Sequence, residues 1–289
     1  MKTSPERVAQ AAQLAMLIEL SSTPKPGNVD RGHDFEEIKF HHFLISAVSA
    51  YPIFRDAAIG SEPTGALIRR AVSSWKSWGL SQNTHFGTVS LLVPLAAAAG
   101  REGDLEEEVA RVLEETTVED AIEFYAAFDI AGARVAEVED LSLKDPKASH
   151  RVRSEGRTLL DLMRLSQGHD LVAREWSTGF ERSFSLAEHL ARRVEELGTN
   201  DGVVMTYIEA LAEVPDSLVA AKFGMEKAKE ASARAGSILG LEACETLRLA
   251  EELDRKFVEE DINPGSTADL IGAALFIALV RGTILESEG

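Results

Sequence analysis

Residues 4–20 read SPERVAQAAQLAMLIEL, and the pattern of this stretch decides the fold class. Ser4 followed by Pro5 is typical of a helix start, because serine caps a first turn and proline is tolerated at the first helical position. The apolar residues that follow recur at three- and four-residue steps, at Val8, Ala11, Ala12, Ala15 and Leu20. That period indicates an α-helix with one buried face, ending near Leu20.

The same helical period continues along most of the chain. It covers ten further segments, at about 35–58, 62–79, 86–100, 104–115, 118–137, 170–197, 201–213, 217–238, 240–260 and 267–286. No alternating run of β-branched residues between turn signals indicates a strand. We therefore predict an all-α protein, a single compact multi-helix domain over residues 1–289, with a polar surface connection at 138–156.

The amino-acid composition limits the kinds of partner that the protein is expected to bind. A formal net charge of -18 opposes nonspecific binding to nucleic acid or to an anionic membrane, so a phosphate ligand would need positive charge supplied locally. The longest apolar run, 89–99, is too short to span a bilayer, and the N-terminus lacks a secretory pattern. With one cysteine, Cys244, predicted to be buried, we expect a cytoplasmic protein.

Three polar loops, 21–34, 79–87 and 261–269, interrupt the helices. In each, glycine or proline restricts the backbone and polar side chains precede the next helix, whose N-terminus suits a phosphate group. We predict an active site formed by loops between helices.

The first loop holds the strongest candidates. Glu19 lies at a helix C-terminus, where an acid opposes the helix dipole, so a ligand or base is favoured over a surface charge. Lys25 lies between Pro24 and Pro26, which favours phosphate binding over a solvated loop charge. Asp30 is a candidate metal ligand or base in the same loop.

Other polar residues have more than one interpretation each. Asp34 is a metal ligand or, with Glu37, a capping box for the next helix. His33 is a proton donor, a ligand or a plain loop residue. Asn83 and His85 precede an apolar helix, so they contact a nucleotide or serve as an N-cap and a turn residue.

These loops also carry a resemblance. Residues 17–34, 83–87 and 263–270, with the block 215–224, are similar in content and order to the motifs of the triphosphoribosyl-dephospho-CoA synthase family, in its archaeal-type branch. The resemblance implies a transferase that joins ATP to 3′-dephospho-CoA. In that reaction the 2′-hydroxyl of the acceptor attacks the ribose C1′ of ATP, adenine leaves, and 2′-(5″-triphosphoribosyl)-3′-dephospho-CoA forms.

The resemblance and the chemistry together assign roles. Oxocarbenium character at C1′ calls for carboxylates, and a retained triphosphate calls for a lysine and Mg²⁺ or another divalent cation. The expected catalytic residues are Glu19, Asp30 and His33. The expected nucleotide contacts are Lys25, Asn83, His85, Asp216, Lys222 and Asn263. The expected metal ligands are Glu19, Asp30, Asp34 and Asp269.

Several of these roles have structural alternatives. Asp216 also suits an N-cap, Asn263 a turn before Pro264, and Asp269 a capping box with Ser266. The chain departs from the bacterial pattern in its short 31–33 connection and in Phe86, where relatives place lysine.

Two other functions stay open. One is ATP-dependent ribosyl transfer to a different acceptor, such as a pterin or sugar-phosphate precursor, and the other is a non-catalytic helical nucleotide-binding protein. The apolar faces of the C-terminal helices suit a buried central helix or a homodimer seam, at Leu270, Ala273, Ala274, Phe276 and Ile277.

Overall fold

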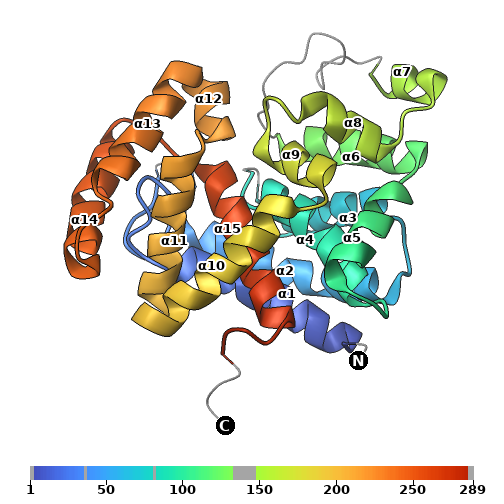
Figure 1. Ribbon diagram of the computed structural model, residues 1–289. Helices are drawn as coiled ribbons and strands as arrows, with labels where there is room; N and C mark the ends of the chain where they lie inside the picture. Colours follow the sequence, from blue (N-terminus) through green and yellow to red (C-terminus); the bar gives the residue numbers. More distant parts are fainter. Residues whose placement is uncertain (1–2, 36–37, 81–82, 133–147, 286–289) are drawn as a thin grey trace. The chain divides into compact units, whose positions relative to one another are not determined.

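The computed structural model describes residues 3–35, 38–80, 83–132 and 148–285. Over these ranges it contains fifteen α-helices and no β-strand; the only β-type pairing there is an isolated bridge between Asp30 and His33 (Figure 1). The predicted all-α class is confirmed. Internal contacts divide the chain into two compact units, residues 1–14 with 42–181 and residues 15–41 with 182–289. The single domain over 1–289 stays a prediction.

The first unit contains the start of α1 (Pro5–Ser21) and eight further helices among the described residues. These are α2 (Phe40–Ile59), α3 (Thr64–Lys76), α4 (Phe86–Ala99), α5 (Leu105–Glu114), α6 (Val118–Ala131), α7 (Ala148–Glu155), α8 (Leu159–Ser166) and α9 (Leu171–Thr178). Nearly every side chain of α4 is buried, and α3, α5 and α9 pack against it. The core of this unit therefore surrounds α4.

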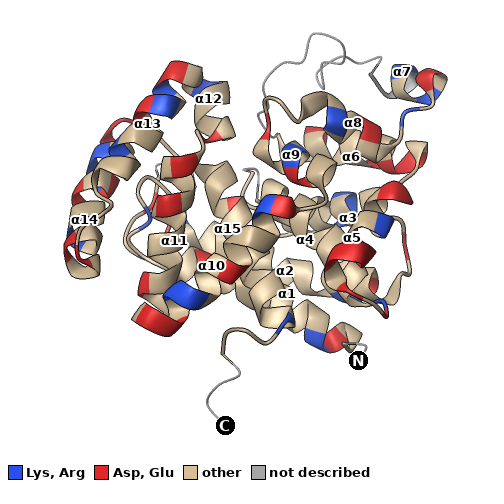
Figure 2. Ribbon diagram, in the orientation of Figure 1, with Lys and Arg blue, Asp and Glu red and all other residues tan. Residues whose placement is uncertain are grey.

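Among the described residues, the second unit contains the end of α1, the non-helical residues 22–35 and 38–39, and six helices. They are α10 (Glu181–Leu197), α11 (Thr199–Glu213), α12 (Ser217–Phe223), α13 (Met225–Ser237), α14 (Ala243–Glu259) and α15 (Gly265–Val280). Figure 2 shows charge spread over α10, α13 and α14, whereas α15 carries a single charged residue, Asp269. Charged side chains avoid fully buried positions, so α15 is suited to the core of this unit.

The apolar face of α15 is buried within the single chain, with exposures of 0–2% at Leu270, Ala273, Ala274, Phe276 and Ile277. The buried central helix is therefore the correct one of the two interpretations for these residues.

Four predicted segments need correction. The segment 170–197 is two helices, because Gly179 and Phe180 both take a positive φ that no α-helix continues through. The segment 217–238 breaks likewise at Gly224, with φ 90°. Of the predicted connection 138–156, residues 138–147 lie outside the described residues and α7 occupies most of the remainder. Helix α2 begins at Phe40 instead of residue 35.

Two local predictions also fail. Cys244 is exposed, because it lies in the first turn of α14 on its polar side. Helix α8 was not predicted; Thr158 begins it with a capping box completed by Asp161. No described helix combines the length and hydropathy needed to cross a membrane.

Candidate active site

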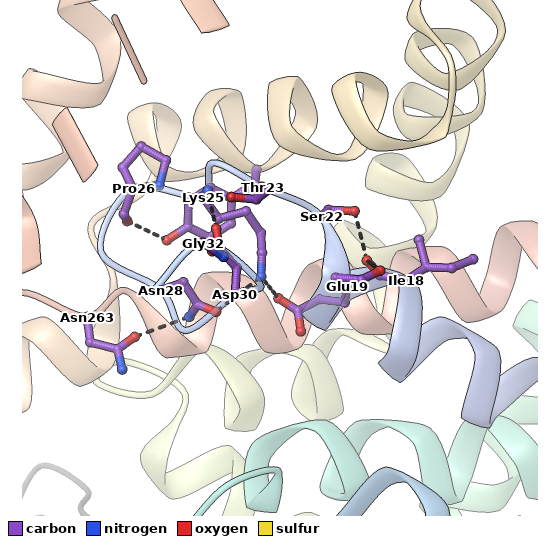
Figure 3. A network of polar contacts seen from close by, with 12 residues as sticks. Ile18, Glu19, Ser22, Thr23, Lys25, Pro26, Asn28, Asp30, Gly32 and Asn263 are labelled. Carbon is purple, nitrogen blue, oxygen red and sulfur yellow. Dashed lines mark hydrogen bonds and ion pairs between the residues drawn. The ribbon is translucent and has the colours of Figure 1, made fainter. Parts of the chain in front are cut away.

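The backbone of the loop after α1 contacts residues from several other segments of the second unit. Gly27 has φ 75°, and a Cβ built on it would lie 2.2 Å from the backbone oxygen of Ile262, so only glycine fits here. The Tyr207 hydroxyl donates to the carbonyl of Pro26 at 3.0 Å. The Asn200 side chain accepts from the Thr23 amide at 3.1 Å and donates to the Thr23 carbonyl at 2.9 Å. These contacts fix the path of the loop, which Figure 3 shows from close by.

Lys25 and Glu19 form a buried ion pair. The Lys25 side chain is 0% exposed, and its Nζ lies 2.7 Å from Oε1 of Glu19, whose residue is 6% exposed. The ammonium also donates to Oδ1 of Asn28 at 3.2 Å (Figure 3). Lys25 is therefore not a solvated loop charge, and that alternative is excluded.

Asp30 lies beside this pair with 1% exposure. Its Oδ2 accepts from the Lys25 amide at 3.1 Å and its Oδ1 from the Gly32 amide at 2.6 Å. The pKa of Glu19 is raised, because burial outweighs the attraction of Lys25, and the negative charge of Asp30 adds to the increase. Glu19 thus pairs with the ammonium of Lys25 and Asp30 accepts from its backbone amide, within one desolvated cluster.

His33 extends the cluster. Its Nδ1 lies 3.1 Å from Oδ2 of Asp254 and 3.8 Å from Oδ1 of Asp30. Burial lowers the pKa of His33, but the carboxylates of Asp254 and Asp30 outweigh it, and the net shift is upward. Three predicted catalytic residues, Glu19, Asp30 and His33, therefore lie in one loop system of the second unit.

The C-terminal motif and the 215–224 block join this system. Asn28 Nδ2 donates to Oδ1 of Asn263 at 3.1 Å. Asp216 is fully buried and caps α12 by accepting from the amides of Leu218 and Val219. Its other oxygen accepts from the Thr267 amide at 2.7 Å and hydroxyl at 2.9 Å. Asp216 thus has the predicted N-cap role. Its hydrogen bonds with Thr267 also connect the 215–224 block to the C-terminal motif.

Lys222 and Asp34 have partners outside the buried cluster. Lys222 is surface-exposed and forms an ion pair with Asp261. Asp34 accepts from the Phe40 amide at 2.6 Å, so it contacts the start of α2, and the capping box with Glu37 falls partly outside the described residues. Asp269 is half-buried on α15. The predicted capping box with Ser266 is wrong, because α15 begins after Pro264 without a side-chain cap.

The four predicted metal ligands do not form a protein-only site. Over the described ranges, no three His, Cys, Asp or Glu side chains are grouped so that they could hold a metal ion. Glu19 and Asp30 are close enough for the charge of Asp30 to raise the pKa of Glu19.

The second motif belongs to the first unit. Oδ1 of Asn83 accepts from the Phe86 amide at 3.2 Å, but the N-cap position of α4 is His85, so the N-cap interpretation of Asn83 is wrong. His85 is buried, with Nδ1 2.6 Å from the Ser46 hydroxyl and the ring edge-on to Phe43. It is therefore not a solvated turn residue. Phe86 packs into an aromatic cluster with Phe124 and Phe128, as its apolar side chain favours.

Asp254 was missed by the sequence analysis. Its Oδ1 accepts from the Gly27 amide at 2.8 Å, and its Oδ2 contacts His33. It lies on α14 among charged residues with helical spacing, at Glu251, Glu252 and Arg255, so the sequence offers no signal that separates it from a solvated face.

The described residues form an all-helical protein with titratable residues gathered at the end of α1 and in the proline-containing loop after it, and comparison with known proteins shows its family. The chain belongs to the ATP:dephospho-CoA triphosphoribosyl transferase (CitG) family, which it matches over residues 5–287.

Relatives support the same family. A protein of Stutzerimonas stutzeri named "Probable 2-(5''-triphosphoribosyl)-3'-dephosphocoenzyme-A synthase" is 25% identical over 95% of this chain and 92% of its own length. A protein of Pseudomonas savastanoi with the same name is 24% identical over 94% and 90%. A crystal structure from Archaeoglobus fulgidus, given the name triphosphoribosyl-dephospho-CoA synthase provisionally, has a TM-score of 0.68 and 29% identity. It covers 83% of this chain and 99% of its own.

Proposed function

We propose that this protein transfers the triphosphoribosyl group of ATP to the 2′-hydroxyl of 3′-dephospho-CoA and releases adenine. The observation that carries the proposal is the cluster of buried Glu19, Lys25 and Asp30 with half-buried His33. The cluster lies at the end of α1 and in the following loop, whose sequence resembles the first family motif. Binding alone does not require so many titratable groups in one desolvated loop.

The residue types suit displacement at C1′. The C1′–N9 bond breaks with its electron pair going to adenine, and the bond from C1′ to the acceptor oxygen forms. The carboxylates of Glu19 and Asp30 stabilise the oxocarbenium character between these events, and one of them accepts the hydroxyl proton. His33, whose pKa is raised, supplies a proton to a purine nitrogen as adenine leaves.

Lys25 is assigned to the triphosphate as well as to Glu19. An ammonium group has three N–H donors, and two of them have partners in Glu19 and Asn28. We assign the third to a phosphate oxygen. Asn263, which receives a hydrogen bond from Asn28, is the next nucleotide contact that we propose. Asp216, Lys222, Asn83 and His85 stay predictions in this role.

A divalent cation accompanies the triphosphate in this proposal. The hard oxygen donors of Glu19 and Asp30 suit it, and two buried carboxylates with one lysine leave negative charge that a cation would balance. Because the described residues supply no three-ligand group, phosphate oxygens and water would complete its coordination. Its chemistry would be charge neutralisation on the triphosphate.

The substrates that we propose are small molecules. The cytoplasmic location, the exclusion of nucleic acid as a partner and the homodimer stay predictions.

The test is incubation of the purified protein with ATP, Mg²⁺ and 3′-dephospho-CoA, with free adenine measured by chromatography. We expect adenine release that requires the acceptor and is lost in Glu19→Gln and Asp30→Asn. Formation of ADP or AMP, or no nucleotide turnover with any acceptor, would contradict the proposal. Adenine release only with a different acceptor would favour the alternative function, ribosyl transfer from ATP to another acceptor. Phe86, at the position where the family resemblance implies lysine, also favours that alternative.

A further inference from the structure

Arg31 follows Asp30 in the loop after α1, and a second segment of the chain orients its exposed side chain. Its Nη2 donates to Oδ1 of Asn200, in the first turn of α11, at 3.0 Å. The same oxygen accepts from the Thr23 amide at 3.1 Å, and Nδ2 of Asn200 donates to the Thr23 carbonyl at 2.9 Å and to Asp201 at 2.8 Å. The guanidinium group therefore rests on a part-buried amide that other hydrogen bonds hold in place.

The positive charge of Arg31 is not neutralised within the loop. Residues 19–34 contain one lysine and one arginine. The ammonium of Lys25 pairs with the Glu19 carboxylate at 2.7 Å. The one partner of Arg31 among the residues that the structure describes is the uncharged amide of Asn200. Arg31 is thus the cation of this segment whose charge is available to an anion.

The guanidinium group also has donors to spare. An arginine side chain carries five N–H donors in a planar fork, and the bond to Asn200 uses one of them. This fork matches the spacing of two phosphate oxygens, which it can bind with two parallel hydrogen bonds. Because Asn200 already restricts the side chain, less conformational entropy is lost on binding than with an unrestrained surface arginine. Arg31 is therefore suited to a phosphate group.

We infer that Arg31, in the orientation that Asn200 gives it, binds a phosphate group of a substrate. The inference rests on the proposed function, in which both substrates carry phosphates: the triphosphate of ATP and the diphosphate of 3′-dephospho-CoA. A chain with a net charge of -18 must supply positive charge locally to bind such groups. Lys25 alone does not supply it, since Glu19 balances its charge.

The first readout is kinetic. Arg31→Gln removes the charge and keeps a polar side chain, and we expect it to raise the KM of one substrate by about tenfold to a hundredfold. The change in kcat should stay below about threefold, because the contact is made before and during the transfer alike. A raised KM for ATP assigns Arg31 to the triphosphate, and a raised KM for 3′-dephospho-CoA assigns it to the diphosphate.

Arg192→Gln is the matched control. Arg192 is an exposed arginine on α10 of the same unit, and it too hydrogen-bonds a side chain, that of His189. The variant changes the net charge equally, so its two KM values should stay at those of the wild type. Unchanged KM values for both substrates in Arg31→Gln, a fall in kcat alone, or the same change in both variants would overturn the inference.

The second readout needs no turnover. Inorganic tripolyphosphate and 3′-dephospho-CoA are titrated separately into each protein by calorimetry. We expect Arg31→Gln to weaken the binding of at least one of them by about tenfold or more, with Arg192→Gln binding as the wild type does. Equal affinities in Arg31→Gln and wild type would refute the inference. The two proposals fail differently: a wild type that releases no adenine refutes the proposed function, whereas an active wild type matched by Arg31→Gln in KM and affinity refutes this inference alone.

Discussion

Asn28 donates a hydrogen bond from Nδ2 to Oδ1 of Asn263 at 3.1 Å, although 235 residues separate them along the chain. The bond connects the loop after α1 to the start of α15. Since Asn28 also accepts from Nζ of Lys25, the C-terminal motif is linked through one amide to the buried ion pair. The first and third motifs thus form one polar network (Figure 3).

Removing the lysine of the buried pair should destabilise the protein strongly. Lys25→Met leaves the Glu19 carboxylate buried without its cation, and we expect a loss of about 3–5 kcal/mol in the free energy of unfolding. Lys222→Met, which breaks the exposed pair with Asp261, is the control and should lose about 0–1 kcal/mol. Denaturant unfolding measures both.

The double variant Glu19→Gln with Lys25→Met should recover much of that loss, because an uncharged pair carries no unpaired charge. Equal losses in Lys25→Met and Lys222→Met would show that the buried pair is not as we describe it.

Gly27 is expected to tolerate no side chain. Gly27→Ala adds a methyl group 2.2 Å from the Ile262 carbonyl oxygen at a positive φ. Gly60 has nearly the same φ, 74°, but open space around it, so Gly60→Ala should lose only about 1–2 kcal/mol for the backbone conformation. The steric clash should lower the free energy of unfolding of Gly27→Ala by about a further 1–3 kcal/mol. Thermal unfolding of both variants checks the order, and equal losses would contradict the close approach.

Asp216 should contribute far more to the free energy of unfolding than an ordinary helix cap does. In Asp216→Asn, an NH₂ group replaces one of two oxygens that together accept from Leu218, Val219 and Thr267, and leaves at least one buried donor without a partner. We expect a loss of about 1–3 kcal/mol. Asp104, the exposed cap of α5, is the control, since Asn caps a helix as well as Asp does. If Asp216→Asn were as stable as Asp104→Asn, the hydrogen bonds from Thr267 to Asp216 would be excluded.

The raised pKa of Glu19 predicts a pH dependence of stability. The native carboxyl binds its proton more tightly than the unfolded chain does, so its contribution to the free energy of unfolding falls as pH rises. The fall begins near the ordinary pKa of 4.5 and is complete above the raised native value. Glu19→Gln lacks this group. The stability advantage of the wild type over Glu19→Gln should therefore shrink with rising pH over that range, and a constant or growing difference would be the contrary result.

Local patterns predicted much of the fold. The Ser4-Pro5 start and the apolar period placed α1 at Pro5–Ser21, and α4 likewise began at Phe86 as expected. The break at Phe180 was not predictable, because a positive φ at a non-glycine residue depends on tertiary contacts and not on local preference.

The proximity of the candidate residues was predictable where they are close in sequence. Lys25, Asp30 and His33 come from one loop and Glu19 from the last turn of the helix before it, so they are close together in the sequence as well as in the structure. Asp254 comes from a helix more than two hundred residues away, and its neighbours have the composition of a solvated face. Only the packing of α14 against the loop, where Gly27 has no side chain, brings it to His33.

The measurement that tests the proposed function most directly follows the phosphates of ATP. The protein is incubated with Mg²⁺, 3′-dephospho-CoA and ATP carrying a label in its γ-phosphate. The CoA product is then isolated and its mass is measured by mass spectrometry. Displacement at C1′ predicts a product that contains the ribose and all three phosphates, label included, with one adenine released for each product formed. A label found in inorganic phosphate or ADP, with the acceptor unchanged, would contradict it.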